Sequence, residues 1–355
     1  MGHIRTDGTG IKLRPRFRRI DIDSVTDEQL AAFPDRIIHQ TRPWVNFLER
    51  TLDAEPVLAV LEEDDRVLGY FTGLIAKEFG FRILGSPFPG WSTTYMGFNL
   101  LPGVRRAIAL EALADFAFKD LKCDHLEIMD RQLKHEDATS LGFNIWNFET
   151  LEVDLSPSEE SIFANMKHQC RNCIRKAERS GVRIEEANDA EFADDYYEQL
   201  THVFAAKGLL PPFDVHRVRD LIHFLLPTGR LLLLRARNQE GICIATGIFP
   251  AMNVTMYAWG SASWRQYSNV RPNEAIFWHA MKYWKRRGVL VCDLVGAVHY
   301  KLKYGGRASV IPWVRKSRTK AIAALRTTAE SLLLKHPRSL GRLLSLTKQL
   351  FGHRR

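Results

Sequence analysis

The sequence predicts an α/β protein whose mixed sheet is built from two tandem lobes and followed by a basic helical tail. With 355 residues the chain is long for a single hydrophobic core, so two domains are expected. Two similar segments, 57–75 and 231–249, begin 174 residues apart. Each resembles two apolar strands around a polar turn, with Thr-Gly at the same offset, which favours an internal repeat.

The same order of elements continues after each hairpin. Helix-like stretches at 103–120 and 272–287 lead into apolar strands, and a Cys-Asp pair lies in each strand, at Cys123–Asp124 and Cys292–Asp293. Hairpins that alternate with amphipathic helices are typical of a mixed sheet with helices on its faces. We therefore expect an N-terminal lobe at 20–150 and a C-terminal lobe at 151–315.

The composition is that of an ordinary globular protein, with 45% apolar and 26% charged residues. The sequence has no run of about 18 apolar residues, and its N-terminus lacks the apolar core of a secretion signal, so we expect a cytoplasmic protein. Cys170 and Cys173 form a CxxC without a second ligand pair. This favours packed helix thiols and predicts no metal site.

Positive charge is concentrated at both ends of the chain. Residues 1–19 carry a net charge of +5 and residues 315–355 carry +10, whereas the whole chain carries +9, so the middle is acidic. The sequence predicts a basic arm at 1–19 and a tail at 316–355 made of amphipathic helices broken at Pro337. Such a tail could bind the phosphates of an anionic membrane surface or of RNA, pack on the lobes or a second subunit, or aid solubility.

A basic helix is predicted at 157–180. Ser156, Pro157 and Glu159 form a helix-start signature with a capping box. Four cations spaced four apart share one edge of that helix: Lys167, Arg171, Arg175 and Arg179. They indicate either a solvated face or a phosphate-bearing ligand.

A second anion site is predicted where a helix begins at Pro272. The strand ending at Tyr257–Gly260 is followed by a polar loop, and Arg265, Arg271 and Asn273 lie around the helix start. Free backbone N–H groups and the helix dipole at such a start can hold a pyrophosphate.

The motifs that follow resemble those of the FemAB/CelD-like branch of the GNAT acyltransferase superfamily. Asp293-x-x-Gly296 precedes an aromatic-Lys-x-x-aromatic-Gly element, Tyr300 to Gly305. The segment ending KAERSGV is similar to the family's basic helix, and Pro272-x-Glu-Ala is similar to its helix start. The likeness covers about 160 residues, mainly 155–315.

The resemblance implies two tandem GNAT lobes and transfer of an acyl group to an amine or, less typically, a hydroxyl. It implies that Lys301 stabilises the carbonyl oxygen, that Tyr257 or Tyr300 donates a hydrogen bond, and that Asp293 accepts the amine's proton. Acyl-CoA, for example acetyl-CoA, is the expected donor. The residues expected to bind the donor's phosphates are Arg265, Arg271, Asn273, Lys167, Arg171 and Arg175. The expected acceptor is an envelope sugar, a lipid-linked precursor or a small metabolite. The protein is expected in the cytoplasm or peripherally on the inner face of the membrane.

Two other functions stay open. A FemX-like enzyme would use aminoacyl-tRNA, although the short Gly296-to-Lys301 spacing and the lack of a long heptad insertion favour acyl-CoA. The glycine-rich loop of CoA-binding relatives is replaced by residues 268–274, which leaves the donor open. A non-catalytic module binding RNA or a membrane is the third reading. From the residues alone, Asp293 could also cap a turn and Lys301 could be a surface lysine.

Overall fold

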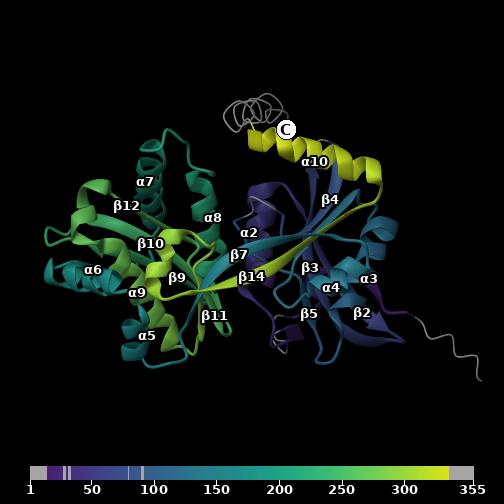
Figure 1. Cartoon of the computed structure of the whole chain (residues 1–355), viewed down its shortest axis with the longest axis horizontal. Coiled ribbons are helices and arrows are strands. Elements are labelled where there is room, and N and C mark those ends of the chain that lie inside the picture. Colours follow the sequence, from purple (N-terminus) through teal and green to yellow (C-terminus); the bar gives the residue numbers. More distant parts are fainter. Residues whose placement is uncertain (1–13, 27–28, 31–32, 79, 89–91, 336–355) are drawn as a thin grey trace, which may run out of the picture.

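The computed structural model describes residues 14–335 except 27–28, 31–32, 79 and 89–91 (Figure 1). In this part of the chain, the strands form one 14-stranded mixed sheet. The main path through the sheet is β1-β2-β3-β4-β6-β14-β7-β13-β11-β10-β9-β8, while β5 pairs with β3 and β12 pairs with β10. The predicted mixed α/β fold is thereby confirmed.

The strands of the two halves follow the same order. The first half holds β1 Arg16–Ile20, β2 Glu55–Glu63, β3 Arg66–Glu78, β4 Phe81–Ser86, β5 Phe98–Leu100, β6 His125–Met129 and β7 Asn144–Asp154. The second half holds β8 Arg183–Glu186, β9 Leu231–Arg237, β10 Cys243–Met252, β11 Thr255–Tyr257, β12 Gly260–Ser263, β13 Val291–Asp293 and β14 Arg307–Ser317. In each half a hairpin precedes a parallel pair, β4 with β6 and β11 with β13. The repeat deduced from the hairpins is therefore present in the topology.

The last strand of each half pairs with the other half. β14 lies between β6 and β7, and β7 lies between β14 and β13. Figure 1 shows both strands running across the middle of the molecule, with the first half on the right and the second on the left. The β7–β14 ladder spans nine residue pairs, with Phe148 opposite Ile311 at its centre. This reciprocal exchange makes the sheet continuous.

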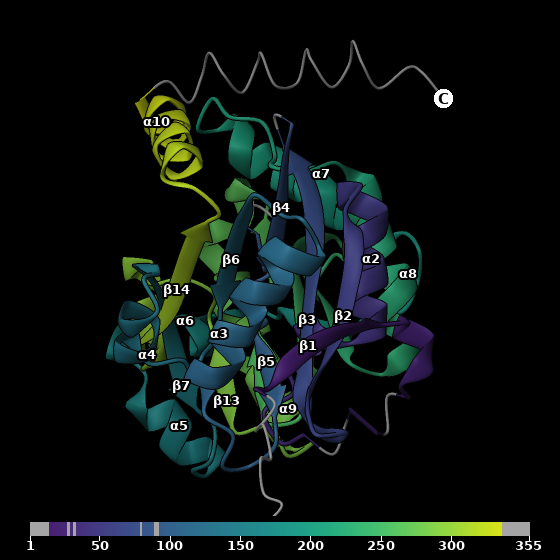
Figure 2. The same cartoon turned by 90° about the vertical axis from the view of Figure 1, so that its right-hand side faces the viewer.

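Helices cover both faces of the sheet. Among the described helices, three pack on one side, here called the α2 face: α2 Arg42–Leu52, α7 Phe192–Ala205 and α8 Val215–Leu225. Five pack on the other side, the α9 face: α3 Arg106–Asp115, which a π-helical turn extends, α4 His135–Ser140, α5 Glu159–Asn165, α6 His168–Arg179 and α9 Pro272–Lys285. In Figure 2 the first-half strands β1 to β4 and β6 lie side by side, with α3 in front of them. Short 3-10 turns include η2 Ile38–Gln40, η5 Arg265–Val270 and η6 His299–Tyr304.

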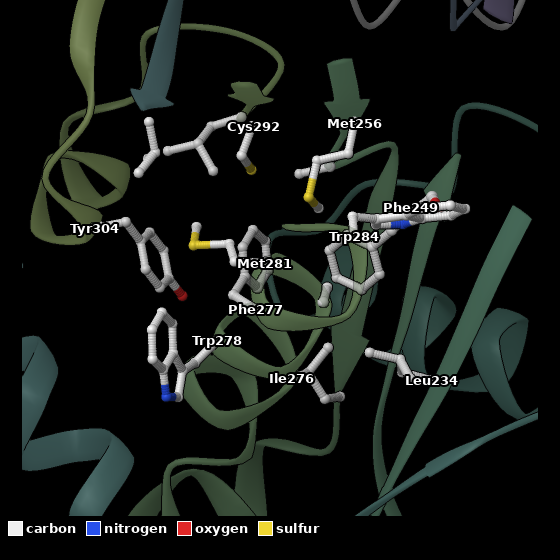
Figure 3. Packing of buried hydrophobic residues seen from close by; sticks show 14 of the residues in the cluster. Leu234, Phe249, Met256, Ile276, Phe277, Trp278, Met281, Trp284, Cys292 and Tyr304 are labelled. Atoms are coloured by element: carbon white, nitrogen blue, oxygen red, sulfur yellow. The ribbon is translucent and has the colours of Figure 1, made fainter. Parts of the chain in front are cut away.

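The α9 face of the second half has a dense aromatic and sulfur-rich core (Figure 3). Phe277 of α9 stacks on Tyr304 at 4.9 Å between ring centroids, and Met281 and Cys292 lie in the same cluster. Trp284 donates a hydrogen bond to the carbonyl oxygen of Phe249 in β10. This packing fixes α9 against β10 and η6, so the start of α9 has one defined position.

The described part of the tail is α10, Lys320–Lys335. Arg326 of this helix forms an ion pair with Glu127 of β6, whose side chain is completely buried. In Figure 1, α10 lies along the upper edge of the first half. The second predicted helix, after Pro337, lies outside the described residues, as does most of the predicted basic arm. Among the helices that are described, none is both long enough and apolar enough to cross a bilayer.

Several local predictions need correction. The predicted helix at 157–180 is two helices, because the backbone is extended at Met166 and Lys167 between α5 and α6. The cap of α5 is Ser158, whose Oγ accepts a hydrogen bond from the Ser161 N–H, and not Ser156. Cys123 and Asp124 precede β6 instead of lying in it.

Two proposed segment boundaries cross elements of the sheet. The end of the predicted basic arm, residues 16–19, belongs to β1, which pairs with β2. The boundary between the predicted lobes, at 150/151, falls inside β7, whose last three residues pair with β13 of the second half.

Candidate active site

Asp293 ends β13 on the α2 face and is completely buried. Its Oδ1 accepts hydrogen bonds from the Thr150 hydroxyl at 2.5 Å and from the Val295 N–H at 2.8 Å. The Thr150 hydroxyl also accepts a bond from the Gly296 N–H. Among the described residues, Asp293 Oδ2 has no hydrogen-bond partner. A buried carboxylate oxygen with no partner is energetically costly, so it marks a position where a proton, a water or a ligand is expected.

The backbone next to Asp293 is strained. Val295 has a φ of +55°, a conformation that a β-branched residue rarely adopts, and Gly296 follows with a φ of +90°. Strain of this kind persists where the surrounding structure enforces it, and it is concentrated at functional sites. Here the hydrogen bonds to Asp293 and Thr150 enforce it.

Residues of both halves converge on Asp293. Tyr257 is its direct partner in the parallel β11–β13 pair, and Glu152 is its direct partner across β7–β13. The Tyr257 hydroxyl donates to the Tyr95 hydroxyl at 3.1 Å, and Arg131 lies 3.4 Å from the same Tyr95 oxygen. Arg131 also donates to Glu152 Oε2 at 2.7 Å. We call this group the Asp293 cluster: Tyr95, Arg131, Thr150, Glu152, Tyr257 and Asp293.

Burial dominates the electrostatics of the cluster. Burial raises the pKa of Asp293, although hydrogen bonds from Thr150 and Val295 and the charges of Arg131 and Lys301 oppose the shift. Burial also raises the pKa of Glu152, where Arg131 opposes the shift and Asp293 adds to it. The pKa of Tyr257 is well above its usual value for the same reason, so this phenol stays a hydrogen-bond donor at neutral pH.

Lys301 lies in η6, close behind the Asp293 loop, and is 9% exposed. Its ammonium donates to the carbonyl oxygens of Leu294 and Val295, the latter at 2.8 Å. Burial lowers its pKa, while the charge of Asp293 opposes that effect. A lysine ammonium has three donors, so these two bonds leave one for another acceptor. Lys301 therefore supports the loop that carries Asp293 and is not a surface lysine.

Tyr300 is placed differently from the other predicted catalytic residues. Its side chain is 57% exposed, and its ring lies beside the ammonium groups of Lys301 and Lys303 at about 6 Å from the centroid. The structure thus groups Asp293, Tyr257 and Lys301 around one loop, with Tyr300 on the surface next to them.

The predicted donor-binding residues at the start of α9 form a separate group on the α9 face. Arg265 and Arg271 are exposed, and Arg271 occupies the N-cap of α9 with a φ of +61°. Asn273 donates to Ser263, and in the part of the chain described here its Oδ1 is buried without a partner. The first turn of α9 contains one acidic side chain, Glu274, whose carboxylate is paired with Lys303 at 2.7 Å.

The cations of α6 have diverse contacts. The Lys167 side chain is exposed at the N-cap of α6. Its backbone N–H donates to the Lys303 carbonyl oxygen, which places this N-cap next to η6. Arg171 donates to the carbonyl oxygens of Ala164 and Met166, so it satisfies the C-terminal end of α5. Arg175 lies over the ring of Phe163 at 5.3 Å. The fold itself thus uses two of these charges, a role that helical spacing did not indicate.

Four members of the Asp293 cluster were not predicted from sequence: Tyr95, Arg131, Thr150 and Glu152. All four belong to the first half, whereas the sequence motifs lie in the second. Glu152 gives one signal in the sequence, because it is a charged residue between the apolar residues Leu151 and Val153. The partner that this charge faces is visible only once β7 is seen to pair with β13.

Comparison with known proteins identifies the second half. Residues 164–303 match the family model described as acetyltransferase (GNAT) domain. This segment includes α6, α9, β13 and Lys301. These residues are a GNAT-type acetyltransferase domain.

Solved structures extend this assignment to the whole fold. The crystal structure of FemX is similar with a TM-score of 0.67 and 14% identity, over 83% of this chain and 96% of that chain. A tandem GNAT protein from the clavulanic acid biosynthesis pathway has a TM-score of 0.53 and 11% identity, over 85% of this chain and 98% of the other. L-PGS from Bacillus licheniformis has a TM-score of 0.53 and 12% identity, over 86% and 96%.

These similarities concern the fold. The chain has the tandem GNAT-like, FemAB-like fold that the sequence motifs implied, so the predicted resemblance is confirmed. No curated protein matches the chain with significance. The fold is that of acyl and aminoacyl transferases, and the substrate has to be argued from the site.

Proposed function

We propose that the protein transfers an acyl group from acyl-CoA to an amine, or a hydroxyl, of an envelope sugar, a lipid-linked precursor or a small metabolite. In this proposal the lobe at 151–315 is catalytic and the lobe at 20–150 completes the site. The observation that carries the proposal is the unpartnered, buried Oδ2 of Asp293 within the matched GNAT segment. A carboxylate with a raised pKa in such a position is suited to accept a proton.

In the proposed reaction the acceptor nitrogen attacks the carbonyl carbon of the thioester. A C–N bond forms, the C–S bond breaks, and the sulfur leaves as the thiolate of CoA. Asp293 takes the proton that the nitrogen loses. The negative charge that develops on the carbonyl oxygen is stabilised by the remaining donor of Lys301, with Tyr257 or Tyr300 as a further donor.

The donor's phosphates are assigned to the ends of α6 and α9. Arg265, Arg271 and Asn273 at the start of α9 supply two guanidinium groups and free backbone N–H groups. Lys167, Arg171 and Arg175 of α6 lie on the neighbouring helix, which packs against α9. The exposed Lys167 and Arg271 are the strongest candidates of the six, because the contacts above occupy Arg171 and Arg175.

Aminoacyl-tRNA is the alternative donor, favoured by the similarity of the fold to FemX over most of both chains. The two donors are distinguished by incubating the purified protein with candidate acceptors and either acetyl-CoA or charged tRNA. Activity that requires CoA and survives RNase supports the proposal. Activity that survives without CoA and is abolished by RNase selects the alternative.

Lys301→Ala tests the catalytic assignment. Loss of one preorganised oxyanion donor lowers kcat by about 100-fold or more, so we expect a loss of this size with the fold retained in circular dichroism. Lys176→Ala, an exposed lysine of α6, is the matched control. An unchanged rate for Lys301→Ala would favour a non-catalytic module that binds RNA or a membrane.

We further propose that the tail places the enzyme on an anionic membrane surface. Because α10 is joined to Glu127 through Arg326, the truncation should remove only residues 336–355. Reduced flotation of the truncated protein with vesicles of anionic lipid would support this location. Equal flotation of the two proteins would refute it.

A further inference from the structure

A second carboxylate, that of Glu152, lies next to Asp293. Glu152 of β7 lies directly opposite Asp293 of β13 in an antiparallel pair, and both side chains are on the α2 face. Directly opposed residues in such a pair have Cβ atoms about 4.5–5.5 Å apart. Each half of the chain therefore contributes one carboxyl group to the same place in the sheet.

Each carboxylate has one satisfied and one unsatisfied oxygen. Thr150 and the Val295 N–H bind Oδ1 of Asp293, and Arg131 binds Oε2 of Glu152. Among the described residues, Asp293 Oδ2 and Glu152 Oε1 are both buried without a hydrogen-bond partner. The nearby Ser309 hydroxyl helps to keep the pKa of Glu152 down, although it makes no hydrogen bond of good geometry to Oε1.

The surrounding cations do not fill this position. Arg131 is bound to the other oxygen of Glu152, and Lys301 donates to two backbone carbonyls. Arg307, the partner of Glu152 in β14, is exposed at the start of its strand. Tyr95 and Tyr257 bind each other. Two close carboxylates without a cation between them do not both ionise readily, so they hold a proton or a cationic ligand.

We propose that Glu152 and Asp293 form one proton-sharing pair that binds the acceptor through a primary ammonium group. The inference rests on the proposed acyl transfer and defines its acceptor class. An ammonium group has three N–H donors and can satisfy both unpartnered oxygens, whereas a hydroxyl has a single donor and satisfies only one. The Glu152 side chain is 15% exposed, whereas Asp293 is completely buried.

The pair also carries the proton transfer. Binding of the ammonium releases the shared proton to water, so both unpartnered oxygens can accept its N–H bonds. One N–H bond of the bound ammonium breaks, its electron pair stays on nitrogen, and the proton forms an O–H bond with one carboxylate oxygen of the pair. The neutral amine then attacks the acyl carbon, and the C–S bond breaks with the thiolate of CoA as leaving group. The second proton, which the nitrogen loses as the C–N bond forms, goes to the carboxylate of the pair that is still ionised.

Infrared difference spectroscopy tests the shared proton without any substrate. The wild-type protein should show a protonated carboxyl band that persists near neutral pH, and both Glu152→Gln and Asp293→Asn should abolish or shift it. Glu149→Gln is the matched control, because Glu149 lies on the same strand but is exposed on the opposite face. A band that is unchanged in Glu152→Gln would overturn the proposal.

Kinetics with acetyl-CoA test the acceptor class. For the acceptor found in the donor screen, we expect the amine to react and its hydroxyl analogue to lose roughly 100-fold or more in kcat/KM. Glu152→Gln should lower kcat/KM for the amine and move the acidic limb of its pH profile, whereas Glu149→Gln should leave both unchanged. An acceptor that reacts through a hydroxyl would overturn the ammonium assignment. If the wild-type protein transfers no acyl group at all, the proposed function fails, and the infrared result still decides whether the proton is shared.

Discussion

The hydroxyl of Tyr257 donates a hydrogen bond to the hydroxyl of Tyr95, over 3.1 Å. The two residues are 162 positions apart in sequence and belong to different halves of the sheet. His39 packs against this pair, with its ring 4.5 Å from that of Tyr257 and its Nδ1 2.9 Å from the Tyr95 carbonyl oxygen. Tyr95 of the first half therefore holds Tyr257 of the second half in place next to Asp293.

Tyr257→Phe should destabilise the protein modestly. The substitution removes one buried hydrogen bond, which corresponds to about 1 kcal/mol of the free energy of unfolding. Urea unfolding followed by fluorescence measures the change. Tyr95→Phe should cost at least as much, because it removes the same bond and also the hydroxyl that Arg131 contacts. The matched control is Tyr283→Phe, which keeps the ring beneath Arg287 and should be close to neutral. A neutral Tyr257→Phe would show that the hydroxyl pair does not join the halves.

Asp293→Asn should become more stable relative to the wild type as the pH rises. The pKa of Asp293 is raised by burial, so the folded state binds its proton more tightly than the unfolded state. The free energy of unfolding of the wild type consequently falls as the pH rises from about the ordinary value of 3.8 through the higher folded pKa. Asparagine lacks this dependence. Urea titrations at a series of pH values measure the difference, and a constant difference at every pH would contradict the prediction.

Ser158→Ala should destabilise α5, whereas Ser156→Ala should not. Ser158 Oγ accepts the hydrogen bond from the Ser161 N–H that caps the helix, and loss of such a cap removes about 1 kcal/mol. Ser156 caps no N–H of α5; its N–H donates to Asp154 Oδ1, and its hydroxyl lies beside the same surface carboxylate. Thermal unfolding of the two variants compares these neighbouring serines directly. Equal effects would mean that the helix begins where the sequence first indicated.

Arg326→Ala should release α10 and leave a buried charge on Glu127. Removing one partner of a buried ion pair typically destabilises by about 3–5 kcal/mol. His125 reports the change, because burial and then the charge of Arg326 lower its pKa to about 3. The variant should therefore raise the pKa of His125, measured by NMR of its ring protons. The double variant Glu127→Gln/Arg326→Ala should recover much of the stability, and failure to recover it would point to packing by α10.

Local patterns were sufficient for most elements of this fold. Both hairpins and the helices at 103–120 and 272–287 were predicted from apolar periodicity, because each depends on neighbours in sequence. The helix start at Ser158 was displaced by two residues, since several serines in that segment can cap and the tertiary contacts decide between them. The extended backbone at Met166–Lys167 gave no compositional signal.

The site was less predictable, for a physical reason. Asp293 and Lys301 were found through short motifs of contiguous sequence, and their placement near one loop agrees with the expected grouping. Glu152 and Arg131 depend on pairing between strands distant in sequence, which no local pattern encodes. The match of the two Cys-Asp pairs was also misleading. In the second half, Asp293 of β13 pairs with Glu152 of β7. In the first half the residue that pairs with the exchanged strand β14 is Glu127, opposite Arg315, and not Asp124.

The position of β7 and β14 also bears on how this protein can be dissected. The segment with a recognisable family signature, 164–303, contains neither of these strands. Expressed alone it would expose an unpaired edge at β13, which favours aggregation over a soluble minimal domain. A cut in a surface loop of the intact molecule should instead yield two fragments that remain interlocked and co-purify.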